Sequence, residues 1–216
     1  MRVLPQIGSK NTLVQRAYEA IREAIITNKF KPGQVLAEES LAQELAISRT
    51  PVRTALRTLS FERLIIINSS RNMVVAGFTE KDIVDITVVR ESLETLAASL
   101  LATKLTPEQA KELESIIKEQ TGCLKKNDFN GFVKCEYEFH TNIAVFTGNT
   151  WLSEMVEHVN VILRRYLILS GSLELYGGLA MEEHKMILQG IESREAGKAE
   201  QMMRNHIKNV AERILK

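Results

Sequence analysis

The segment ISRTPVRTALRTL, residues 47–59, decides the fold of the first third of the chain. Its apolar residues recur at helical spacing and form one arc, which consists of Val52, Ala55, Leu56 and Leu59. Arg53 and Arg57 stay within about 40° of each other on a separate arc, because a helix turns about 100° per residue. We therefore expect one side of this helix to pack on a core and the other side to stay free.

The sequence around this helix predicts a winged helix-turn-helix. Ser48 or Thr50 is expected to cap the helix, with Pro51 in its first turn. The other expected elements are a helix over residues 12–28, a turn at Pro32-Gly33 and short strand at 34–36, a helix over 38–45, and a hairpin formed by 64–67 and 73–76. Helix, short strand, helix, tight turn, helix and hairpin is the order of a winged helix-turn-helix domain.

The free side of the third helix has the chemistry of a DNA reader. In a helix-turn-helix this side enters the major groove with its N-terminus first. Arginine can donate two hydrogen bonds to guanine O6 and N7 or bind phosphate, and threonine can hydrogen-bond phosphate. Thr50, Arg53, Thr54 and Arg57 are thus candidate DNA-binding residues. A solvated amphipathic helix with incidental arginines is the alternative interpretation.

Charge and periodicity divide the chain near Gly77-Phe78. Residues 1–78 contain 11 Lys and Arg against 6 Asp and Glu, and residues 79–216 contain 17 against 21. A basic N-terminal segment followed by an acidic C-terminal segment indicates a polyanion-binding domain joined to a domain with a different function. From Thr79 onward, helical periodicity predicts about six helices in an antiparallel bundle, with a capping box at TPEQ (106–109) and its loosest stretch at 170–178. The fold class is mainly α, with domains at 1–78 and 79–216.

Four residues of the helical body can form a metal site. Glu136 and His140 are four residues apart and share a helix face, whereas His184 and His206 fall on later helices. One carboxylate and three imidazoles suit a divalent transition metal, with zinc or nickel the best matches. For each histidine alone, an ordinary core or surface role is the alternative, and we assign that role to His158.

Length and composition exclude several classes of protein. No apolar run approaches the roughly 20 residues that span a bilayer, and the start MRVLPQIGSKNTL lacks a signal-peptide core. The two cysteines, Cys123 and Cys135, do not form a disulfide framework and are expected to be small hydrophobic residues. We therefore expect a cytoplasmic protein with no membrane partner.

Residues 11–78 resemble the DNA-binding domain of GntR-family transcription regulators. The matching segments, in order, are KPGQVL, ESLAQELAIS, SRTPVRTAL and FERLI. The resemblance implies that Ser48, Arg49, Thr50 and Arg53 contact DNA, with Arg71 and Asn72 at the wing tip near the minor groove. Two departures stand out: Glu39 replaces an arginine that often contacts DNA, and Asn72 replaces a glycine. Asparagine tolerates a left-handed turn, so we expect the wing to survive.

Residues 79–216 resemble the FCD ligand-binding domain of the FadR-like branch of this family. The matching segments are EKDIVDITVVRESLETLAA, EFH…TGN and EEHKMILQGI…HI. Metal-binding members use an aspartate four residues before the first histidine and two later histidines. His140, His184 and His206 match these positions, but the carboxylate here is Glu136, which is one methylene longer.

The resemblance also implies a small carboxylate effector that the metal helps to hold. Arg90 is the candidate for the effector clamp by its matching position, and Arg164 or Arg165 is a second candidate. An ion pair with Glu94, four residues along the same helix, is the alternative role for Arg90.

The predicted protein is a metabolite-responsive repressor that binds a palindromic operator as a homodimer. Two other functions remain open: a regulator for which the metal itself is the signal, and a one-metal hydrolase in which the site activates water.

Overall fold

The computed structural model describes residues 12–215. The chain divides into two compact units, 1–77 and 78–216, each of which is described by itself. The opening residues, which support the expectation that a signal peptide is absent, lie largely outside the described range. Within that range, none of the helices is both long enough and apolar enough to cross a membrane.

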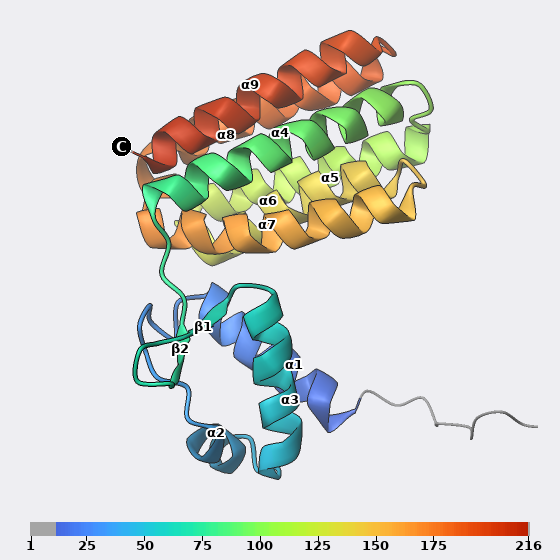
Figure 1. Ribbon diagram of the computed structural model, residues 1–216. Helices are drawn as coiled ribbons and strands as arrows, with labels where there is room; N and C mark the ends of the chain where they lie inside the picture. The colour runs from blue at the N-terminus through green and yellow to red at the C-terminus, as the bar shows by residue number, and fades with distance from the viewer. Residues whose placement is uncertain (1–11, 216) are drawn as a thin grey trace, which may run out of the picture. The chain divides into compact units, whose positions relative to one another are not determined.

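The first unit is a winged helix-turn-helix, as predicted. Its elements are α1 (Leu13–Ile26), α2 (Glu38–Glu44), α3 (Arg49–Phe61), β1 (Ile65–Ile67) and β2 (Met73–Val75) (Figure 1). The helix α1 starts where Thr12 accepts a hydrogen bond from the backbone N–H of Gln15. This side-chain oxygen satisfies one of the amide groups that a helix start leaves without a partner.

The apolar arc of α3 is buried and its polar arc is exposed. The buried residues of the arc, all with no exposed surface, are Val52, Ala55, Leu56 and Leu59. They pack mainly against α1, whose own inward side contains Ala17, Ile21 and Ile25. Arg53 and Arg57 are exposed, so the division into two sides that the periodicity predicted is confirmed.

The wing is a two-stranded antiparallel hairpin in which Ile65 pairs with Val75 and Ile67 with Met73. The strand predicted at residues 34–36 is reduced to one bridge between Val35 and Val74. Backbone hydrogen bonds to β2 flank this bridge, but Gly33, with φ 79°, turns the chain immediately before it. The segment is too short between its turns to form a regular strand.

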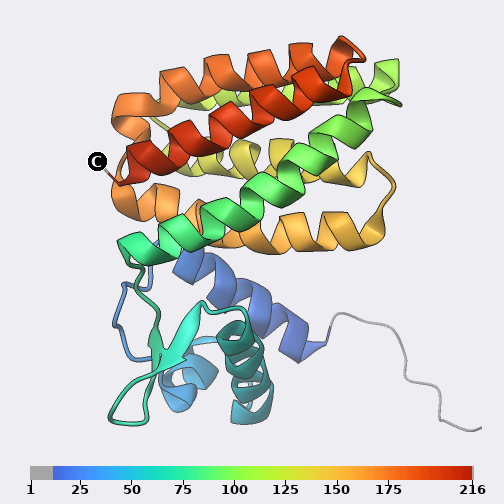
Figure 2. The same ribbon diagram turned by 45° about the horizontal axis from the view of Figure 1, so that its top comes forward.

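The second unit is a bundle of helices with a single hydrophobic core (Figures 1 and 2). Its helices are α4 (Glu80–Ala102), α5 (Pro107–Lys125), α6 (Phe129–Val145), α7 (Thr150–Ser170), α8 (Leu173–Glu192) and α9 (Ala196–Ile214). Six helices in the described residues match the predicted number. The capping box predicted at Thr106 and Gln109 is present, with Pro107 in the first turn.

The core of the bundle surrounds a small polar centre. Phe132, Phe139 and Ile207 are fully buried apolar residues. The charged or titratable residues buried among the helices include Glu136 and His140, which α6 contributes. Since burying such groups without partners is costly, their contacts define the site.

Candidate metal centre and DNA-binding surface

Four side chains from three helices meet inside the bundle. Glu136 and His140 come from α6, His184 from α8 and His206 from α9. One nitrogen or oxygen atom from each lies within 4.8 Å of the others, and none of the four residues is more than 2% exposed. The four residues that sequence reasoning selected are therefore in one place.

An oxygen atom faces the Nδ1 atom of each imidazole. These oxygens are Gln120 Oε1 at 2.8 Å from His184, Glu183 Oε2 at 2.9 Å from His206, and Glu94 Oε2 at 2.5 Å from His140. An acceptor at Nδ1 favours the tautomer with the proton on that nitrogen, which leaves the lone pair of Nε2 available. The Nε2 atoms all lie near Glu136, at 3.3 Å for His140 and His184 and at 3.6 Å for His206.

The polar centre has fewer hydrogen-bond partners than its buried atoms require. Among the described residues, Glu136 Oε1 and His184 Nε2 are buried without a hydrogen-bond partner, and His140 Nδ1 has only its close ion-pair contact with Glu94 Oε2, which does not have the geometry of a hydrogen bond. His140 Nε2 and His206 Nε2 are 3.2 Å apart, so two ring nitrogens also face each other. A divalent cation would satisfy a carboxylate oxygen and inward lone pairs together, so the donor set of three nitrogens and one oxygen fits a transition metal.

Electrostatics favours the metal-binding form at two of these groups. Burial lowers the pKa of His184 to about 4, which keeps it neutral at pH 7. Burial would raise the pKa of Glu136, but the imidazoles of His184 and its neighbours hold that pKa well below its usual value. For His140, burial opposes the charge, but Glu94 and Glu136 outweigh it and raise the pKa to about 9. A metal must therefore displace a proton from His140.

A buried ion pair between Arg90 and Glu94 contacts His140 on its Nδ1 side. Arg90 is 1% exposed, and its Nε donates to Glu94 Oε1 at 2.7 Å. Asn160 donates to the same oxygen at 3.1 Å, while the other carboxylate oxygen of Glu94 faces His140. The ion pair that was the alternative role for Arg90 is thus present, and it links this arginine to the polar centre.

The remaining candidates of the helical body lie elsewhere. The guanidinium of Arg164 stacks over the ring of Tyr137 at 5.4 Å, and burial lowers the pKa of Arg165. His158 is exposed on α7, as expected for an ordinary histidine. Cys123 and Cys135 are free thiols, of which the second is buried.

Sequence reasoning assigned none of the three residues that face the imidazoles to the site, although it named Glu94 as a partner of Arg90. Glu183 directly precedes His184, but it contacts His206, on a different helix. Glu94 and Gln120 belong to α4 and α5, far along the chain from the histidines that they contact. Nothing in the local pattern distinguishes them from other polar helix residues, because only the packing of the helices brings them to the imidazoles.

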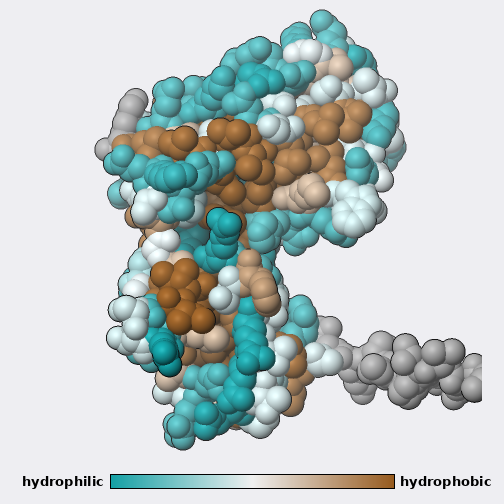
Figure 3. Space-filling view, in the orientation of Figure 1, coloured by the Kyte–Doolittle hydropathy of each residue, from teal (hydrophilic) through white to brown (hydrophobic). Residues whose placement is uncertain are grey.

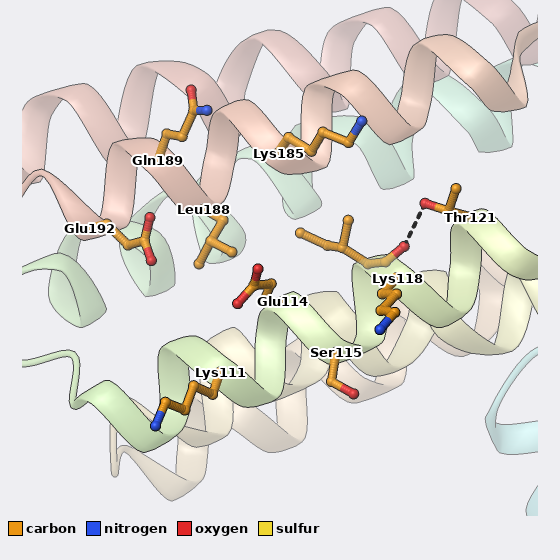
Figure 4. Close-up of a pocket in the computed structure, with 10 residues that line it drawn as sticks. Lys111, Glu114, Ser115, Lys118, Thr121, Lys185, Leu188, Gln189 and Glu192 are labelled. Carbon is orange, nitrogen blue, oxygen red and sulfur yellow. Dashed lines mark hydrogen bonds between the residues drawn. The ribbon is translucent and has the colours of Figure 1, made fainter.

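A separate surface groove runs between α5 and α8 (Figure 4). It has a volume of about 690 Å³, and Lys111, Lys118 and Lys185 line it together with Glu114 and Glu192. None of the four residues of the polar centre lines this groove. Since its charges are mixed and Lys185 already pairs with Glu182, it does not have the character of a dedicated anion site.

The candidate DNA-binding residues lie on one surface of the first unit. The cavity there, of about 530 Å³, is lined in part by Arg49, Arg53 and Arg57 of α3 and by Arg71 and Asn72 of the wing. Ser48 occupies the N-cap position of α3 without a capping hydrogen bond from its side chain, and both Ser48 and Thr50 are exposed. The helix begins at Arg49, so Ser48, and not Thr50, is the residue of the two predicted caps that occupies the N-cap position.

The wing tip differs from expectation in one detail. The residue with positive φ is Arg71, at 61°, rather than Asn72. The reason is Asn68, whose Oδ1 accepts hydrogen bonds from the backbone N–H groups of Ser70 and Asn72 at 3.0 and 2.9 Å. This side chain closes the turn and places the left-handed residue at Arg71.

Two family models match the chain. The model described as "FCD domain" matches residues 85–209, and the model described as "Bacterial regulatory proteins, gntR family" matches residues 13–75. Similar proteins include the gluconate operon transcriptional repressor of Bacillus subtilis, which is 25% identical over 213 residues, or 96% of this chain and 87% of that protein. The uncharacterized HTH-type regulator YdhC of Bacillus subtilis is 25% identical over 198 residues, 91% of this chain and 88% of that one.

Solved structures share the fold. Escherichia coli McbR/YncC has a TM-score of 0.81 at 20% identity, with 92% of this chain and 94% of that chain covered. A GntR regulator from Rhodococcus sp. RHA1 has a TM-score of 0.82 at 20% identity, with 94% and 97% covered. The family consists of DNA-binding regulators and not enzymes. Since the FCD match alone covers more than half of the chain, the chain belongs to the GntR family of bacterial transcription regulators, in the group that has an FCD domain.

Proposed function

We propose that this regulator is a metabolite-responsive repressor whose helical unit holds a divalent metal, zinc or nickel, at Glu136, His140, His184 and His206. The observation that carries the proposal is the convergence of these four buried groups within 4.8 Å, with an acceptor beside each Nδ1. Buried imidazoles oriented in this way are the usual ligands of a protein-bound metal.

The DNA-binding half of the proposal assigns operator contacts to α3 and the wing. Arg53 and Arg57 supply base or phosphate contacts from the exposed side of α3, and Ser48, Arg49 and Thr50 contact the backbone near its N-terminus. Arg71 and Asn72 reach toward the minor groove. All of these side chains are exposed, and those of the arginines and Asn72 line one depression, which supports the assignment. Repression is proposed because the similar Bacillus subtilis protein is a transcriptional repressor.

A homodimer on a palindromic operator is proposed from an exposed apolar stripe. Val84, Val88 and Leu96 of α4 are about half exposed, and Trp151 and Met155 are exposed residues of α7, a helix that packs against α4. Figure 3 shows apolar surface gathered along these helices of the second unit. A patch of this kind needs a partner, and a second copy of the chain would pair two DNA heads with two half-sites.

A small carboxylate is the proposed effector because of the charges around the polar centre. A divalent cation on Glu136 would leave net positive charge there, since Arg90 and Arg213 already balance Glu94 and Glu183. An anion is the complement of such a site. Arg90, and less directly Arg164, remain the proposed effector contacts.

A regulator that senses the metal itself is the second candidate. It is favoured by the burial of the whole donor set, with no more than 2% of any ligand residue exposed. Operator affinity that follows metal concentration without an organic acid would identify this function. The one-metal hydrolase is set aside, because the family and the relatives are transcription regulators. In either case we propose that the protein acts in the cytoplasm, where it meets DNA.

The deciding experiment measures metal content by mass spectrometry on protein purified without chelator. Wild type and His158→Ala, which changes an exposed histidine, should each retain about one equivalent, whereas His184→Ala should lose most of it. Equal, negligible metal in all three, even after incubation with zinc and nickel salts, would refute the metal site. An effector search would then start from ligands that need no metal.

A further inference from the structure

Glu38 and Arg53 form a bidentate ion pair on the proposed DNA-binding surface. Arg53 Nε donates to the two carboxylate oxygens of Glu38 at 3.0 and 2.9 Å, and Arg53 Nη2 lies 2.9 Å from Oε2. Glu38 belongs to the first turn of α2 and Arg53 to α3, so the pair joins the two helices of the helix-turn-helix. Arg49 is also near, with its Nη2 at 3.8 Å from Glu38 Oε2.

The position of the pair argues against a role in folding. The side chain of Arg53 is 48% exposed and that of Glu38 is 23% exposed. Ion pairs at such exposed sites contribute little to stability. The contact between α2 and α3 already has a buried apolar core that includes Leu41, Ala42 and Val52. An acidic group on a surface that must meet phosphate also weakens attraction to DNA. Glu38 therefore needs another explanation.

The geometry of the guanidinium suggests that explanation. The edge formed by Nε and Nη2 is occupied by Glu38, so Nη1 and the second hydrogen of Nη2 are the donors that remain for another partner. These donors are the pair that can contact guanine O6 and N7. A side chain held on one edge presents the other edge in a fixed direction, so less rotamer freedom is lost when it binds a base.

The neighbouring residue gives an internal comparison. Glu39 has the same charge, lies in the same turn of α2 and lines the same cavity. Within residues 12–215, however, it forms no ion pair with any of the arginines of α3. Glu38 and Glu39 therefore have the same charge, but only Glu38 contacts Arg53. A comparison of variants at the two positions separates the effect of holding Arg53 in place from the effect of a negative charge on this surface.

We propose that Glu38 is a specificity-determining residue of the operator-binding surface, which holds Arg53 in the orientation that reads one base pair and discourages that arginine from binding phosphate alone. The proposal rests on the proposed role of α3 in reading DNA. Glu38 already neutralises the charge of Arg53, so a phosphate is attracted to this guanidinium less strongly, whereas a neutral guanine can accept from the free edge and leave the ion pair intact. Glu38 thereby weakens non-specific binding more than specific binding.

The test begins with selection from a DNA duplex library that has a randomised core, using full-length protein. Wild type, Glu38→Gln, Glu38→Ala, Glu39→Gln and Arg53→Ala are selected in parallel. Binding of each to the wild-type consensus, to its single-base-pair variants and to a scrambled duplex is then measured by fluorescence anisotropy at one salt concentration. Thermal melting establishes that every variant is folded.

The expected result is loss of preference at one base pair per half-site in three of the variants. Arg53→Ala should remove discrimination there, and both Glu38 variants should reduce it roughly tenfold or more, while other positions keep their preference. Glu39→Gln should keep the full consensus, and its binding to the scrambled duplex should rise less than that of Glu38→Gln, because only Glu38 pairs with Arg53. In an Arg53→Ala background, Glu38→Gln should change nothing further at this base pair.

Two results would overturn the proposal without touching the DNA-binding role of α3. One is unchanged discrimination in the Glu38 variants while Arg53→Ala loses it. The other is loss in the Glu38 variants at a base pair different from that of Arg53, which would show that Glu38 contacts a base itself. If Arg53→Ala also keeps the wild-type consensus, the assignment of Arg53 as a base reader fails, and the proposal for Glu38 fails with it.

Discussion

Gln120 accepts a hydrogen bond from His184: its Oε1 lies 2.8 Å from the Nδ1 atom of the imidazole. Its Nε2 donates to Glu136 Oε2 at 3.0 Å. Because a carboxylate at neutral pH only accepts, the amide has one possible orientation, and His184 must have its proton on Nδ1. One uncharged side chain thus fixes two of the proposed metal ligands.

Replacement of Gln120 by leucine should therefore weaken metal binding. Leucine has a similar size but neither hydrogen bond, so His184 can rotate and Glu136 loses one partner. The loss of affinity should be about 10- to 100-fold, as for other residues that orient metal ligands. Competition with a chromophoric chelator measures it. Thr121→Val, which removes a hydroxyl bonded only to its own helix at Ile117, is the control and should leave the affinity unchanged.

Metal affinity should increase with pH up to about 9. Glu94 and Glu136 raise the pKa of His140 to about 9 against the effect of burial, so this imidazole is protonated at pH 7 before metal binds. The metal takes the deprotonated form, and each pH unit below 9 therefore costs up to about tenfold in affinity. Calorimetry in buffers of different ionisation enthalpy would detect the proton released. Binding at pH 7 without proton release would contradict the assignment of His140 as a ligand.

The sequence predicted best those features that a single helix determines. The buried side of α3 and the capping box at Thr106 both depend on residues within one or two turns of each other. Glu136 and His140 belong to the same class, because a spacing of four places them on one face. The partners of the imidazoles depend on how α4 packs against α6, α5 against α8 and α8 against α9, and no local pattern records that.

Gly177 shows how packing overrides local propensity. The stretch 170–178 is predicted to be the loosest part of the body, and α7 does end there, at Ser170, with Gly171 as its C-cap, but α8 begins at Leu173 and includes both adjacent glycines. A Cβ atom on Gly177 would lie 2.8 Å from Leu124 Cδ1. The absence of a side chain at Gly177 permits α8 to approach the end of α5 closely. This glycine is therefore needed for the packing of two helices and is not part of a loop.

The apolar stripe of α4 should form the homodimer contact. Val88→Glu places a charge at its centre, where Val88 is 63% exposed, and should convert a dimer to a monomer because an unpaired charge cannot be buried in an interface. Light scattering coupled to size-exclusion chromatography measures the mass. Leu175→Glu changes an exposed leucine of α8 and should leave the dimer intact. A dimer that survives Val88→Glu would assign the interface to another surface.

The two sides of α3 should respond differently to alanine. Leu56 has no exposed surface, and Leu56→Ala should lower the free energy of unfolding by about 2–5 kcal/mol through lost burial and a cavity. Arg53→Ala removes a side chain that is 48% exposed, so the melting temperature should change little while specific DNA binding is lost. Denaturant unfolding and anisotropy on a selected duplex measure the two effects. A large loss of stability in Arg53→Ala would mean that its pair with Glu38 holds α2 against α3, and that this side of the helix is structural.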